Sequence, residues 1–121
     1  MLIAVSSNDR DGLKGQVSEH FGRCPFYTLI EVQGREIKKV KVIENPYYES
    51  HEPGQVPKFI KSQGVKVMLS GGMGRRAIDL FGRYEIEVAT GANGNVGDTL
   101  GRYLKGNLIS AAPCKESKSH S

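Results

Sequence analysis

The sequence predicts an α/β fold in which helices cover a mixed β-sheet. In the second half of the chain, the pattern of a strand, a glycine-rich turn and a helix occurs twice. This pattern is typical of parallel strands joined by helices. The first half instead contains two apolar runs separated by Gln33-Gly34, which is typical of an antiparallel hairpin. A chain of 121 residues, of which 38% are hydrophobic and 25% charged, is suited to one domain with a buried core.

The first half of the chain is expected to contribute three strands and one helix. Residues 2–6 and 26–32 are short apolar runs, and the second is rich in aromatic and β-branched residues. Residues 35–43 mix apolar side chains with lysines, which are expected either on a solvated face or on an edge strand. Residues 45–54 contain two prolines and no periodicity, which indicates a loop. A helix over 55–63 follows, because its apolar residues recur at helical spacing and a glycine comes directly after it.

The second half is expected to form two strand–turn–helix units. In the first unit the apolar run 65–70 precedes a glycine turn and a helix over 75–81. In the second unit the run 86–89 precedes another glycine turn and a helix over 96–105, which Gly106 ends. Both glycine turns therefore follow a parallel strand.

The composition favours a cytoplasmic single domain with an anionic partner. We expect a domain over 1–106, followed over 107–121 by a short edge segment and a flexible polar tail. The formal net charge of +4 and the pI near 9.1 suit an anion. Two cysteines, Cys24 and Cys114, are too few for a disulfide framework, which favours a reducing compartment. No apolar run approaches the ~18 residues of a membrane span, so we expect no membrane partner.

The two glycine turns form the first candidate site. Because both end parallel strands, they lie at the carboxyl edge of the sheet, where α/β folds bind ligands. Backbone N–H groups at the start of each helix favour an anion, and Arg75 and Arg76 add positive charge. The candidate residues are Gly71, Gly72, Met73, Gly74, Arg75, Gly91, Asn93 and Gly94. Neither turn is a P-loop, because no Lys-Ser or Lys-Thr pair follows, and tight turning without a ligand is the alternative.

The loop between the first two strands forms the second candidate site. Within five residues it gathers the imidazole of His20, the guanidinium of Arg23 and the thiol of Cys24. Imidazole and thiolate suit iron–sulfur and other transition-metal centres, and Arg23 can pair with an anionic ligand. The spacing does not provide the four ligands of a closed zinc site. His20 and Cys24 are thus candidate metal ligands, with structural roles as the alternative, and a surface loop is expected to contribute little to the core.

The His20 loop belongs to a motif over residues 18–26, and the two glycine turns contain motifs at 70–74 and Gly91-Ala92. Asp11-Gly12, Gly15 and Val17 accompany them in the first half of the chain. This combination resembles the dinitrogenase iron–molybdenum cofactor biosynthesis family over about residues 1–106. The His-Phe-Gly and Gly-Gly-Met-Gly elements are fairly specific in combination.

The resemblance implies a ribonuclease H-like fold, with a mixed five-stranded sheet and flanking helices. It also implies a role in binding, carrying or storing an iron–sulfur or iron–molybdenum type cluster or its precursor. His20, the histidine of the His-Phe-Gly motif, is then the cluster ligand, and cofactor-assembly proteins are expected partners. One similar group binds a molybdenum–copper sulfide cluster, so the family does not determine the cargo.

A carrier, and not an enzyme, is the function that combines these features. The N–H groups of the glycine turns with Arg75 or Arg76 would surround an anionic cluster, and His20 or Cys24 would contact a metal. Many ribonuclease H-like proteins are nucleases, but the strands at 2–6 and 65–70 contain no carboxylate to hold metal ions, so we expect no nucleic-acid partner. A non-catalytic module that binds a phosphate-containing metabolite or a protein is the alternative.

Overall fold

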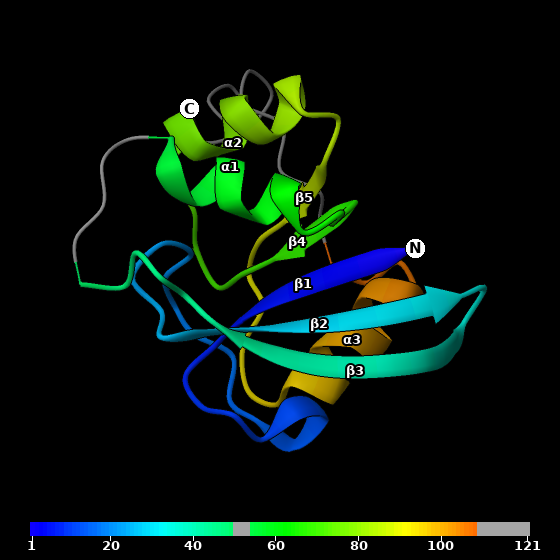
Figure 1. Cartoon of the computed structure of the whole chain (residues 1–121). Coiled ribbons are helices and arrows are strands. Elements are labelled where there is room, and N and C mark those ends of the chain that lie inside the picture. Colours follow the sequence, from blue (N-terminus) through cyan, green and yellow to red (C-terminus); the bar gives the residue numbers. More distant parts are fainter. Residues whose placement is uncertain (50–53, 109–121) are drawn as a thin grey trace.

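Five strands form one sheet with helices on both faces (Figure 1). The computed structural model describes residues 1–49 and 54–108. The strands are β1 (Leu2–Ser7), β2 (Phe26–Gln33), β3 (Glu36–Glu44), β4 (Val67–Leu69) and β5 (Glu87–Ala89). The helices are the 3₁₀ turn η1 (Gly12–Lys14) and the α-helices α1 (Gln55–Ser62), α2 (Arg75–Arg83) and α3 (Val96–Leu104).

The sheet is mixed, in the order β3-β2-β1-β4-β5. The hairpin expected from the first half is present, since β2 pairs antiparallel with β1 and with β3. The strand–turn–helix units place β4 parallel to β1 and β5 parallel to β4. The predicted mixed five-stranded sheet with flanking helices is therefore confirmed, and its arrangement is compatible with a ribonuclease H-like fold.

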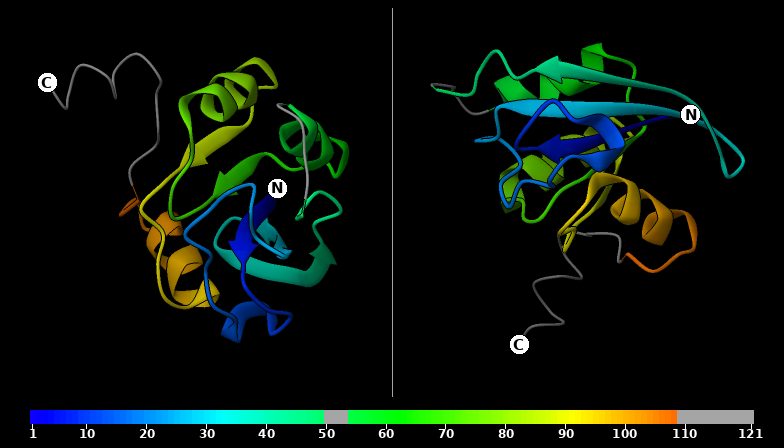
Figure 2. Two further views of the ribbon diagram at one scale, coloured as in Figure 1. Left: turned by 90° about the vertical axis from the view of Figure 1, so that its left-hand side faces the viewer. Right: turned by 90° about the horizontal axis from the view of Figure 1, so that it is seen from below.

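Alternation of side chains along β1 separates two core layers. Ala4 belongs to the cluster that packs under α1 and α2, together with Met68 of β4. Ile3 and Val5 belong to the cluster under α3 on the other face. Figure 2 shows α1 and α3 on opposite sides of the sheet. Because successive strand residues point to opposite faces, the apolar run of β1 is buried on both.

One detail of the fold was not expected from the sequence. The 3₁₀ turn η1 lies between β1 and the His-Phe-Gly loop, and it begins at Gly12, whose φ of 63° favours glycine. Leu108 packs against the α3 layer, and it belongs to the segment 107–121 where a short edge segment and a polar tail were expected. The rest of that segment, 109–121, lies outside the described residues. None of the helices in the described ranges is long and apolar enough to cross a bilayer.

Asn45, directly after β3, anchors the segment that precedes β2. Its side-chain amide donates to the carbonyl of Gly22 at 3.2 Å and to that of Cys24 at 2.9 Å. Its backbone N–H donates to the carbonyl of Pro25 at 2.9 Å. Its side-chain oxygen accepts a bond from the Tyr47 N–H at 2.9 Å. Asn45 is only 6% exposed, so these bonds are shielded from water. The end of β3 therefore determines where residues 22–25 lie.

We predict that Asn45→Ala lowers the free energy of unfolding by roughly 2–3 kcal/mol, because it leaves polar backbone groups without their partner. Asn45→Asp should also destabilise the protein, since a carboxylate cannot donate to the two carbonyls. Urea unfolding followed by circular dichroism measures both changes. Asn107→Ala is the control, because Asn107 is exposed and its side chain makes no hydrogen bond with a described residue. Equal effects at Asn45 and Asn107 would contradict the anchoring role.

Candidate functional site

A segment over residues 15–20 crosses the carboxyl edge of the parallel strands. At its start it is bound to the turn after β5: the Val17 N–H donates to the Gly94 carbonyl at 2.8 Å. The Val96 N–H, at the first residue of α3, donates in turn to the Gly15 carbonyl at 2.9 Å. The crossing segment is thus held against the second glycine turn by reciprocal backbone bonds.

The end of the crossing segment is bound to the first glycine turn, after β4. The Gly71 N–H donates to the Ser18 carbonyl at 3.2 Å, and His20 forms an isolated parallel bridge with Gly72. The His20 N–H also donates to the hydroxyl of Ser18 at 3.2 Å. The His-Phe-Gly loop and the Gly-Gly-Met-Gly turn, which are 50 residues apart in the chain, therefore lie side by side.

Gly71 is required by this close approach. A Cβ atom at this position would lie 2.8 Å from the Glu19 Cα and 3.0 Å from the Ser18 carbonyl oxygen. Both contacts are with backbone, which cannot rotate away as a side chain can. The same Cβ at Gly72 would lie 3.3 Å from the Glu19 carbonyl oxygen. Because Gly71 and Gly72 have no side chains, the backbones of the two loops can touch.

The two loops enclose a surface pocket of about 410 Å³. Its lining residues are Glu19, His20, Phe21, Gly22, Arg23, Gly72, Met73 and Gly74. The volume lies in the range of roughly 300–1,000 Å³ that small ligands and cofactors occupy. The structure thus brings five of the predicted residues into one pocket: His20, Arg23, Gly72, Met73 and Gly74.

The pocket also contains three residues that residue chemistry alone did not select: Glu19, Phe21 and Gly22. All three lie within or next to the His-Phe-Gly motif, so the motif could have identified them as pocket residues. Glu19 is exposed and adds a carboxylate to the rim, whereas Phe21 is buried beneath it. The rim therefore carries both signs of charge.

His20 and Arg23 are exposed and available to a ligand. Neither the imidazole nor the guanidinium forms a hydrogen bond or ion pair with a residue that the structure describes. Met73 is half-buried against the core at the same pocket and supplies a thioether, a second soft donor. Arg75 and Arg76, which were expected beside His20, line a different pocket. The pocket thus presents an imidazole and a thioether as soft or borderline metal donors, with the Arg23 guanidinium and the Glu19 carboxylate beside them.

Cys24 lies in the core and not in the pocket. It is fully buried, and its thiol lies 3.3 Å from the carbonyl oxygens of Phe21 and Phe26, to either of which it can donate its one hydrogen. Burial raises the pKa of the Cys24 thiol. The Tyr27 hydroxyl donates to the same Phe21 carbonyl at 2.8 Å, and the Phe21 ring packs edge-on against Phe81. The expectation that this loop contributes little to the core is wrong, because Phe21 and Cys24 anchor it from below.

The second glycine turn supports the site without lining it. None of its predicted residues, Gly91, Asn93 and Gly94, lines the pocket. The Gly91 N–H donates to the Gly71 carbonyl at 3.0 Å, and the Asn93 carbonyl accepts a bond from the Arg102 guanidinium at 3.0 Å. Gly91 and Gly94 have φ values of 83° and 76°, which favour glycine. This turn therefore holds the first turn in place.

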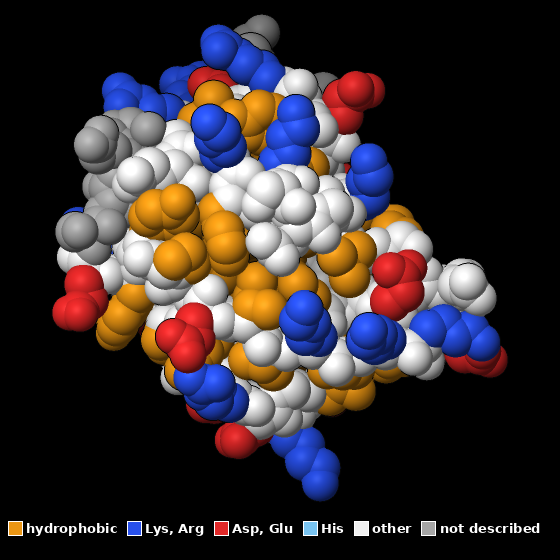
Figure 3. Space-filling view, in the orientation of Figure 1, with side chains coloured by type: hydrophobic (Ala, Val, Ile, Leu, Met, Phe, Trp, Pro, Cys, Tyr) orange, Lys and Arg blue, Asp and Glu red, His pale blue; other side chains and the backbone are white. Residues whose placement is uncertain are grey.

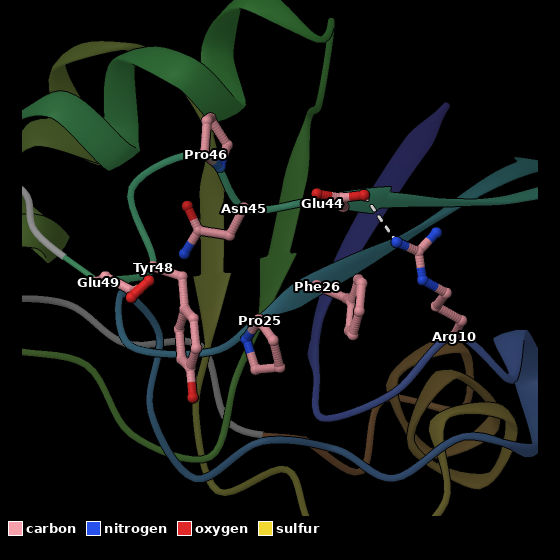
Figure 4. A pocket seen from close by; sticks show the side chains of 8 residues that line it. All are labelled: Arg10, Pro25, Phe26, Glu44, Asn45, Pro46, Tyr48 and Glu49. Atoms are coloured by element: carbon pink, nitrogen blue, oxygen red, sulfur yellow. Dashed lines mark hydrogen bonds and ion pairs between the residues drawn. The ribbon is translucent and has the colours of Figure 1, made fainter.

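Another pocket, of about 430 Å³, lies beside the start of β2 and the end of β3 (Figure 4). Here the Arg10 guanidinium bonds the Glu44 carboxylate at 2.6 Å and lies 4.7 Å from the centre of the Phe26 ring. Glu49 adds a second carboxylate to the lining. Because the Arg10 guanidinium is already paired with the Glu44 carboxylate, the lining of this pocket offers an anion no unpaired positive charge.

Among the described residues, no three His, Cys, Asp or Glu side chains are grouped closely enough to hold a single metal ion. A cluster that brings its own sulfide ligands needs fewer donors from the protein than a bare ion does. The imidazole of His20 and the thioether of Met73 are donor types that soft and borderline metals accept.

A family model described as dinitrogenase iron-molybdenum cofactor matches residues 1–106. The chain belongs to this family. The matched range contains both loops of the His20 pocket and all five strands.

Solved structures resemble the chain over nearly its whole length. The crystal structure of PH0822 is 37% identical, with a TM-score of 0.80, and the match covers 92% of this chain and 96% of that one. The apo form of the orange protein from Desulfovibrio gigas is 22% identical, with a TM-score of 0.80 and 92% of each chain covered, so it shares the fold. A relative is also found by sequence alone: the Methanocaldococcus jannaschii protein MJ0580 is 27% identical over 95 residues, which cover 77% of this chain and 80% of that one.

We predict opposite effects for two glycine-to-alanine changes. Gly71→Ala should destabilise the protein by about 1–3 kcal/mol, because the new Cβ forces backbone apart at Glu19. Gly82→Ala is the matched control: Gly82 is exposed within α2 and has no heavy atom within 4 Å of the added Cβ. Alanine there should stabilise the protein by about 0.5–1 kcal/mol. Denaturant unfolding measures both, and a tolerated Gly71→Ala would show that the loops do not require the close approach.

A second prediction concerns alkaline pH. The unfolded chain releases the Cys24 proton near the ordinary pKa of 9.0, whereas burial keeps the thiol protonated in the native state. Stability should therefore be retained below pH 9 and fall above it, by up to about 1.4 kcal/mol for each pH unit. Burial also raises the pKa of Tyr27 above its ordinary 10.0, which steepens the fall at higher pH.

Urea unfolding at a series of pH values, in a Cys114→Ser background, tests this contribution. The fall in stability just above pH 9 should be shallower in Cys24→Ala, which has no thiol proton to release. Identical pH dependence with and without the Cys24 thiol is the outcome that contradicts the prediction.

Proposed function

We propose that this chain binds an anionic iron–sulfur or molybdenum-containing cluster, or a precursor of one, in the pocket beside His20. It carries or stores this cargo for cofactor assembly, and it performs no catalytic step. The observation that carries the proposal is the meeting of an exposed imidazole without a described partner, a thioether and a guanidinium in one pocket. Membership of a family described by the iron-molybdenum cofactor supports this class of cargo.

The donor chemistry supports a cluster as the ligand. The imidazole of His20 and the thioether of Met73 suit soft or borderline metals, and together they provide fewer donors than a bare ion requires. Sulfides within a cluster supply the remaining coordination. His20 is then the metal contact, Met73 a second contact or a packing surface, and Cys24 the buried support of the loop.

The electrostatics of the pocket favour an anionic ligand on the side of Arg23 and α2. Gly74 is the N-cap of α2 and lines the pocket, so the positive end of the helix dipole lies beside the ligand region. Arg23 adds a full positive charge, while the Glu19 carboxylate at the rim can accept hydrogen bonds from an assembly partner. The cargo is released most easily to a protein that offers stronger soft ligands, such as thiolates.

Anaerobic reconstitution tests the proposal. The purified chain is incubated with ferrous iron and sulfide, with and without tetrathiomolybdate, and desalted, and the bound metal is measured by visible absorbance and elemental analysis. His20→Ala should reduce bound cluster roughly tenfold or more, because loss of a metal ligand costs more than the ~1 kcal/mol of a hydrogen bond. His20→Cys should restore binding, since a thiolate is also a soft ligand.

Lys39→Ala is the control, because Lys39 is exposed on β3, away from the pocket lining. If wild-type protein takes up no cluster under any of these conditions, or if His20→Ala takes up as much as wild type, the proposed function is wrong. Stabilisation by nucleotides without metal uptake would instead favour a module that binds a phosphate-containing metabolite.

A further inference from the structure

A second candidate surface lies on α2, outside the His20 pocket. Its hollow of about 560 Å³ is lined by Gly54, Arg75, Arg76, Asp79, Leu80 and Arg83. It shares no lining residue with the His20 pocket, although Gly74 of that pocket directly precedes Arg75 in the chain. The hollow thus begins where the His20 pocket ends, along the same helix.

The arginines lie on one side of α2 because of their spacing. At ~100° per residue, positions 75, 76, 79, 80 and 83 fall within an arc of roughly 140°, and at ~1.5 Å per residue they extend over roughly 12 Å. Ile78 and Phe81, on the other side, are buried in the core. The arginine side is therefore the side that the fold presents to solvent.

The positive charge of this side is not neutralised within the described part of the chain. Arg76 and Arg83 are exposed, and neither forms an ion pair or hydrogen bond with a described residue. Asp79 is the one carboxylate in the lining, against three guanidinium groups. Arg75 already interacts within the chain, so the free charge belongs to Arg76 and Arg83.

The neighbouring helix α1 extends this surface. Lys58 and Lys61 are exposed on α1, which packs beside α2, and the Lys61 ammonium lies 4.6 Å from the centre of the Tyr84 ring. In Figure 3, Lys and Arg side chains gather over the upper part of the molecule, where α1 and α2 lie. We call Lys58, Lys61, Arg75, Arg76 and Arg83 the basic face.

We propose that the basic face docks an acidic segment of a partner protein beside the mouth of the His20 pocket. Exposed guanidinium groups hold a single small anion weakly, because water and salt screen each contact. Carboxylates along one segment can contact Arg76 and Arg83, which lie roughly 10 Å apart along the helix axis, at the same time. Arginine binds carboxylate in a bidentate manner.

The lining of the hollow further favours a protein segment over nucleic acid. Leu80 is half-buried in the lining, so an apolar side chain of a peptide gains contact there. Asp79 in the middle of the row can accept a hydrogen bond from a peptide N–H group. The proposal concerns docking and holds whatever occupies the His20 pocket.

A labelled peptide rich in glutamate with a central leucine tests this, with fluorescence anisotropy as the readout on protein purified without added metal. Wild-type protein should bind the peptide at low salt and release it as salt is added. The double variant Arg76→Glu/Arg83→Glu should bind about tenfold more weakly or worse, because like charges now face each other. Arg76→Gln/Arg83→Gln, which removes charge without reversing it, should give a smaller loss.

Lys39→Glu/Lys41→Glu is the matched control, since it changes the net charge equally at exposed positions on β3. Its affinity for the peptide should stay within about threefold of wild type if docking depends on charges at the basic face and not on the net charge of the protein. Equal losses in both double variants, or no binding to wild type, would overturn the proposal. Tighter binding of inorganic phosphate or a short DNA duplex than of the peptide, lost in Arg76→Glu/Arg83→Glu, would also overturn it.

Cluster uptake in the reconstitution assay should be unchanged in these variants, which separates this test from that of the His20 pocket.

Discussion

The close approach of the Ser18-Glu19 backbone to Gly71 is the constraint on which the site depends. It joins the loop before β2 to the turn after β4, and so it creates a pocket that neither segment forms alone. The second glycine turn holds the other end of the crossing segment and bonds the first turn directly. Backbone hydrogen bonds, which are short and directional, thereby fix the positions of three loops relative to one another.

The pocket combines a buried, hydrogen-bonded base with exposed polar side chains. Below it, the Cys24 thiol and the Tyr27 hydroxyl both bond the Phe21 carbonyl, and the Asn45 amide bonds the loop from the side. Above, the imidazole of His20 has no described partner that would have to be displaced. Such a division lets a site bind a ligand without rearranging its support, which lowers the entropic cost of binding.

The single helix α2 serves two regions of different chemistry. Its N-terminus borders the His20 pocket, where soft donors meet a partial positive charge. Its solvent side carries the arginines of the basic face, whose charge acts over a longer range than a metal–ligand bond does. The proposed carrier would have to hold its cargo and to meet its partner. On α2 the two candidate surfaces consist of adjacent residues that do not compete for one position.

The sequence by itself determined the mixed sheet, because strand–turn–helix units and a two-residue hairpin turn are local patterns. It also identified His20, Arg23, Gly72, Met73 and Gly74, through motifs that report which backbone and donor types are present. Only the tertiary structure decided that Cys24 faces the core, that Gly91 and Gly94 support the site from behind, and that Arg75 belongs to another surface. These outcomes depend on which face of a loop or helix is covered by segments distant in the chain, and residue spacing does not encode that contact.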